Sequence, residues 1–80
     1  MKVVDLIKDK DYDYIELRIT LPKNVGGGDT FFGSCESKNG ELFSHDQDYY
    51  SKDEEIISYK EWSNKKIKNG LTIIVKGEWN

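Results

Sequence analysis

Leu71-Thr72-Ile73-Ile74-Val75 is the most strand-like stretch of this 80-residue chain. Four of its five residues are large aliphatics, and the last three are branched at Cβ, which suits the pleated surface of a sheet. The preceding pair, Asn69-Gly70, readily adopts the positive φ of a turn. Because an edge strand this apolar would promote aggregation, we expect residues 71–75 to form an interior strand with the other strands arranged around it.

Two further patterns lie near the N-terminus. Apolar residues within Val3–Ile7 fall on one face of a helix, which predicts one or two helical turns packed on the sheet. The segment Tyr12–Leu21 alternates with period two, which predicts a half-buried strand that ends at Pro22. In this strand the expected exposed face carries Tyr12, Tyr14, Glu16, Arg18 and Thr20, and the aliphatic residues lie on the other face.

Three more strands are expected, over Thr30–Ser37, Glu41–Ser44 and Ile56–Trp62. For the last of these a short helix is the alternative, because Glu54–Lys60 contains no helix breaker. Asn39-Gly40 between the first two is a strong hairpin signal, and Gly33 marks a bulge or a close backbone approach. The run Gly26-Gly27-Gly28 lacks the Lys-Ser/Thr end of a phosphate-binding loop, so we interpret it as a hairpin loop.

These elements predict a single α+β domain over residues 1–80: a short N-terminal helix with about five antiparallel strands in a small curled sheet or open barrel. Cys35 is the single cysteine, which fits a reducing, intracellular setting such as the cytoplasm. We expect no signal peptide, no membrane-spanning stretch and no membrane partner.

The candidates for bond chemistry are few. Cys35 and His45 could act as nucleophile and base, but a cysteine is more often a small buried residue. Neither the Asp9-Asp11-Asp13 pattern nor Asp46 with Asp48 continues as a calcium loop, and a lone His45 beside two aspartates is a weak metal site. We therefore expect no enzyme activity, no cofactor and no metal.

Charge is distributed unevenly along the chain. Residues 41–62 hold seven acidic residues against two lysines, whereas residues 63–80 hold four lysines against one glutamate; the whole chain carries −3. An acidic, tyrosine-bearing surface suits a basic partner protein, and such carboxylates can occupy the place of phosphates in a nucleic-acid-binding effector. The residues expected to bind the partner are Asp46, Asp48, Tyr49, Tyr50, Asp53, Glu54 and Glu55.

Two alternatives stay open. The first is a nucleic-acid or nucleotide-binding module in which bases stack on Tyr12 and Tyr14 beside the cations Lys65, Lys66 and Lys68. Because the chain is acidic, direct nucleic-acid binding is a weaker hypothesis than binding to a basic partner protein. The second alternative is a structural or regulatory homo-oligomer in which exposed aromatic residues pair with their own copies.

The segments 11–19, 61–64 and 67–75 resemble short uncharacterised acidic proteins that prophages and mobile elements of low-GC Gram-positive bacteria carry. This resemblance covers most of the chain but contains no motif diagnostic of an activity. It implies a non-enzymatic phage protein that inhibits host defence, of the kind that includes anti-CRISPR proteins, with a CRISPR effector nuclease as one class of target. No site residue is implied by the resemblance.

Overall fold

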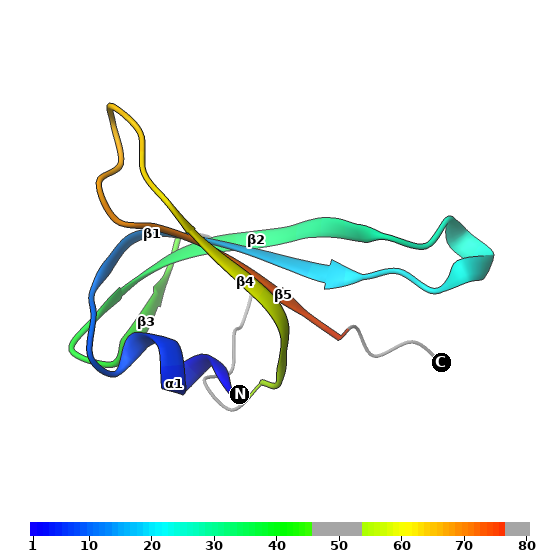
Figure 1. The fold of residues 1–80 in the computed structure, drawn as a ribbon, viewed down its shortest axis with the longest axis horizontal. Helices are drawn as coiled ribbons and strands as arrows, with labels where there is room; N and C mark the ends of the chain where they lie inside the picture. The colour runs from blue at the N-terminus through cyan, green and yellow to red at the C-terminus, as the bar shows by residue number, and fades with distance from the viewer. Residues whose placement is uncertain (46–53, 77–80) are drawn as a thin grey trace.

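The computed structural model describes residues 1–45 and 54–76. Its elements, in chain order, are α1 (Val3–Ile7), β1 (Tyr12–Thr20), the 3-10 turn η1 (Lys23–Val25), β2 (Asp29–Lys38), β3 (Glu41–Ser44), β4 (Ile56–Trp62) and β5 (Gly70–Val75). This is a small α+β fold with one short N-terminal helix and an open five-stranded sheet, as the sequence predicts (Figure 1).

The strand order in the sheet is β3-β2-β1-β5-β4, so β5 lies between β1 and β4. This confirms that the apolar run 71–75 forms an interior strand. Three neighbouring pairs are antiparallel, but β1 and β5 are parallel, with Ile15 opposite Leu71 and Leu17 opposite Ile73. The sheet is therefore mixed, which differs from the all-antiparallel sheet expected, because the last strand returns to pair with the first.

One face of the sheet is the core face. The buried apolar side chains are Val3, Ile7, Tyr12, Ile15, Cys35, Leu71, Ile73 and Val75, with five further aliphatics packed against them. Because strand residues alternate between faces, Tyr14, Thr72 and Trp62 lie on the opposite side, which we call the helix-free face. In Figure 1, α1 lies below the sheet, on the core side.

The helix α1 is attached to the sheet by buried side chains and by backbone hydrogen bonds at its N-terminal end. Val3 and Ile7 are 4% and 0% exposed and contribute to the core. The backbone N–H of Val3 donates to the carbonyl of Glu54, and that of Ile56 donates to the carbonyl of Met1, which joins the chain start to β4. The Asp5 carboxylate accepts the N–H of Lys2 at 2.8 Å and so caps the first turn.

A bulge near the start of β1 changes the expected pattern of faces. Tyr12 pairs with Ser37 and Ile15 with Cys35, so three residue steps on β1 match two on β2. The extra residue places Tyr12 on the core face with Ile15, and Tyr12 is only 3% exposed. The prediction that Tyr12 and Tyr14 share an exposed face is wrong for this physical reason.

Two glycine signals have the roles that the sequence indicates, and one does not. In the β1–β2 register Leu17 lies opposite Gly33 and Arg18 opposite Phe31, so β2 contains one extra residue beside Gly33, which is the bulge expected there. Asn39 and Gly40 have φ of 53° and 79°, the pattern of a type I′ hairpin turn. Gly70, however, does not have positive φ; it is the buried first residue of β5. Within the described residues, no helix is long and apolar enough to cross a membrane.

Candidate binding surface

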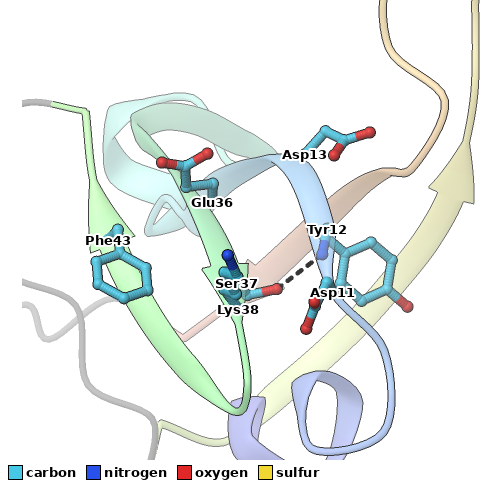
Figure 2. Close-up of a pocket in the computed structure, with 7 residues that line it drawn as sticks. All are labelled: Asp11, Tyr12, Asp13, Glu36, Ser37, Lys38 and Phe43. Carbon is cyan, nitrogen blue, oxygen red and sulfur yellow. Dashed lines mark hydrogen bonds between the residues drawn. The ribbon is translucent and has the colours of Figure 1, made fainter.

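A shallow pocket of about 530 Å³ opens where β1 begins beside β2 and β3. Three carboxylates line it, those of Asp11, Asp13 and Glu36, together with Lys38 and the ring of Phe43. Figure 2 shows Phe43 and Glu36 on the β3 and β2 side of the pocket and the two aspartates on the β1 side. We call these four residues, Asp11, Asp13, Glu36 and Phe43, the acidic pocket.

The acidic pocket lies beside the β1 bulge, where hydrogen bonds hold the start of β1 against β2. Ser37 is 3% exposed, and its hydroxyl accepts the backbone N–H of Tyr12 at 3.0 Å (Figure 2). Asp11 accepts the N–H of Asn39 at 2.9 Å, and Asp13 accepts that of Asn69 at 3.3 Å. Each aspartate therefore has one structural hydrogen bond and still presents negative charge to solvent.

A second group of residues crosses the helix-free face. The rings of Tyr14 and Trp62 have centroids 6.0 Å apart, and those of Tyr14 and His45 are 5.7 Å apart. The Nδ1 of His45 lies 3.0 Å from the hydroxyl of Ser34, which holds the imidazole beside Tyr14. Three aromatic rings, from the end of β3, from β1 and from β4, therefore form one row across the sheet.

The indole of Trp62 is held flat against the backbone of Gly70. A Cβ built on Gly70 would lie 2.6 Å from Cδ2 and Cε2 of the indole, so only glycine fits beneath the ring. The indole Nε1 donates to the hydroxyl of Thr72 at 3.0 Å, which fixes the ring's rotation. Trp62 is half-buried, so this packing leaves part of the ring accessible.

The lysine-bearing connection between β4 and β5 follows Trp62 directly. Asn64 organises it, because its side-chain oxygen accepts the N–H groups of Lys66 and Ile67, both at 2.8 Å. Lys65, Lys66 and Lys68 are all exposed, and within the described residues none of the three forms an ion pair. We call residues 63–69 the lysine loop; in Figure 1 it projects from the sheet far from η1.

The structure separates Cys35 from His45. Cys35 is 2% exposed in the core and lies opposite Ser44 in the hairpin, whereas His45 is exposed and contacts Ser34 and Tyr14. The pair is therefore not placed for nucleophilic chemistry. Residues 1–45 and 54–76 also contain no cluster of three His, Cys, Asp or Glu side chains that could hold a metal ion.

Most of the predicted partner-binding residues lie outside the described residues: Asp46, Asp48, Tyr49, Tyr50 and Asp53. Of the other two, Glu54 is exposed and accepts the Val3 N–H through its backbone. Glu55 is exposed, and its carboxylate lies 3.3 Å from the N-terminal amine.

Sequence reasoning missed the acidic pocket and the position of Trp62. Asp11 and Asp13 are separated from Glu36 by more than twenty residues, and only the β1–β2 pairing brings them together. For Trp62 there was a signal, because Gly70 follows a hairpin loop and precedes a strongly apolar strand, a position where a close approach is common.

No protein-family model, curated protein or solved structure matches this chain.

Proposed function

We propose that this protein is a non-enzymatic binding protein that recognises a basic surface of a partner protein. The observation that carries the proposal is the acidic pocket, in which three carboxylates outnumber the single cation, Lys38, and an exposed phenylalanine lines the same hollow. A lysine or arginine side chain suits such a hollow, because its charge pairs with the carboxylates and its cation can lie over an aromatic face.

Exposed aromatic side chains support a macromolecular partner. Phe43 in the pocket is 50% exposed, and Phe31 and Phe32, farther along β2, are 51% and 41% exposed; exposed aromatic side chains are typical anchors of protein interfaces. The residues that follow β3 in the chain continue the acidic character, since residues 41–62 have a net charge of −5. By its charge, the acidic stretch 46–55 that the sequence predicts to be partner-binding suits the same basic partner as the pocket.

The specific form of the proposal is inhibition of a host defence protein that binds nucleic acid, including a CRISPR effector nuclease. The resemblance to mobile-element proteins supports this setting. The partner's basic residues would then be those that otherwise hold phosphates, so nucleic acid and this protein would compete for them.

The test is a pull-down from a Gram-positive bacterial lysate with three versions of the chain, followed by mass spectrometry and titration of the retained protein. The pocket variant is Asp11→Asn/Asp13→Asn/Glu36→Gln, which keeps the side-chain oxygens that accept backbone hydrogen bonds. The control, Asp5→Asn/Asp9→Asn/Asp29→Asn, removes three exposed acidic charges outside the pocket and outside residues 41–62, and each amide keeps an oxygen that can accept hydrogen bonds.

We expect a basic, nucleic-acid-binding protein to bind the wild type and the control and to be released by added DNA. The pocket variant should bind it at least about tenfold more weakly, since the neutral amides leave the partner's cations unpaired. Equal binding of the pocket variant and the control, with both folded, would refute the pocket as the contact.

A further inference from the structure

We propose that the Trp62 end of the helix-free face binds single-stranded nucleic acid, with a base stacked on the indole and phosphates held by the lysine loop. This inference goes beyond the proposed function and rests on residues outside the acidic pocket. The observation that carries it is the juxtaposition of a flat, fixed ring with exposed lysines that continue from the same strand.

The ring geometry suits a stacked base. Gly70 covers one side of the indole and Thr72 holds its N–H, so the ring has a set orientation before any ligand arrives. Tyr14 and His45 extend the row at centroid distances of 6.0 and 5.7 Å, which offers neighbouring bases further rings. Aromatic platforms of this kind bind bases with little sequence preference, because every base has a stacking face.

The charges beside the ring select a polyanion. Lys60 is exposed and lies opposite Thr72 in the β4–β5 register, on the same face as Trp62, and Lys65, Lys66 and Lys68 follow in the loop. The carboxylate of Glu16, also on this face, lies 3.5 Å from Arg18 Nη1, and Arg18 also pairs with Asp29. Asp13 accepts the N–H of Asn69 at the end of the lysine loop, so the four lysines and Arg18 outnumber these three carboxylates. The charges close to Trp62 decide whether this face attracts or repels a phosphate, because salt screens charges that lie farther away than about 8 Å at physiological ionic strength.

The test measures binding of a fluorescein-labelled oligo-dT or oligo-U of about 12 nucleotides by anisotropy, from about 20 to about 300 mM salt. Tryptophan emission is recorded in parallel in a Trp79→Phe background, in which Trp62 is the only indole. We expect the oligonucleotide to quench Trp62 and its affinity to fall steeply as salt rises.

Two sets of variants separate stacking from charge. The loop variant, Lys65→Gln/Lys66→Gln/Lys68→Gln, should weaken binding and reduce by about 2 the slope of log affinity against log salt concentration. The control variant removes three exposed lysines elsewhere, Lys2→Gln/Lys8→Gln/Lys23→Gln, and should change neither quantity. Trp62→Ala should lower affinity by about fivefold to a hundredfold, and Trp62→Phe should recover part of it. Circular dichroism verifies that each variant is folded.

The outcomes are separable from those of the proposed function. The pocket variant should bind the oligonucleotide at least as tightly as the wild type, because it removes negative charge only. No anisotropy change at low salt, or equal binding by the two lysine variants, would overturn the inference. So would an indole that responds to an arginine-rich peptide and not to the oligonucleotide, since that places a protein on the ring.

Discussion

The hydroxyl of Tyr12 on β1 donates a hydrogen bond to Oε1 of Glu61 on β4 at 2.5 Å, across the intervening strand β5. Lys10 completes the group, with its Nζ 3.6 Å from the same oxygen and 5.2 Å from the centre of the Tyr12 ring. Burial and the negative charge of Glu61 raise the pKa of the Tyr12 phenol. The hydrogen bond from Tyr12, followed by the charge of Lys10, lowers the pKa of Glu61.

Removing the Tyr12 hydroxyl should destabilise the fold. Tyr12→Phe keeps the buried ring but deletes the link between β1 and β4, so we expect a loss of about 1 kcal/mol in the free energy of unfolding. Urea denaturation measures this loss. Tyr59→Phe is the matched control, because Tyr59 is 47% exposed, and it should change stability by less than about 0.5 kcal/mol. Equal losses in both variants would contradict a structural role for this hydrogen bond.

The group formed by Tyr12, Glu61 and Lys10 predicts that the free energy of unfolding depends on pH in the acid range. The pKa of Glu61 is lower in the folded state than in the unfolded chain, so its contribution is present above its unfolded pKa. That contribution is lost as the pH falls through the lower, folded pKa. The wild type should therefore lose more stability than Glu61→Gln between about pH 6 and pH 3 in urea titrations. Parallel curves for the two proteins would contradict the assignment.

At alkaline pH the Tyr12 phenol should behave differently from exposed tyrosines. Its pKa is raised in the folded state, so its contribution to stability is complete below the unfolded value near 10 and is lost as the pH rises above it. An ultraviolet titration should show a late phase in which Tyr12 ionises only as the chain unfolds. In Tyr12→Phe that late phase should be missing. If it persists in the variant, another tyrosine is responsible.

The contact between Gly70 and Trp62 predicts a strong effect of one methyl group. Gly70→Ala places a Cβ about 2.6 Å from the indole, so we expect overpacking to cost about 1–3 kcal/mol and to change Trp62 fluorescence. Thermal unfolding of Gly70→Ala, Trp62→Ala and the double variant forms a cycle. The alanine should cost less once the indole is absent. Additive losses would show that the ring does not lie on Gly70.

Local sequence signals predicted much of the fold. The helix over Val3–Ile7, the Asn39-Gly40 turn and the interior strand at 71–75 all occur, because each depends on residue type over a few positions. The parallel pairing of β1 with β5 could not be predicted this way, since it joins segments more than fifty residues apart. The site was predicted less well: Tyr14 and the lysine loop lie near Trp62, but Tyr12 belongs to the core.

Residue types along the chain suffice to define the strands and the most deeply buried strand, because β-branched residues favour a pleated sheet and a long aliphatic run gains most free energy where neighbouring strands bury it. Long-range strand pairing sets which face each side chain occupies. A single extra residue in β1 turned Tyr12 from solvent to the core, and the β1–β2 register joined Asp11 and Asp13 to Glu36. Such registers result from long-range packing and from bulges, which alternation along one segment does not reveal.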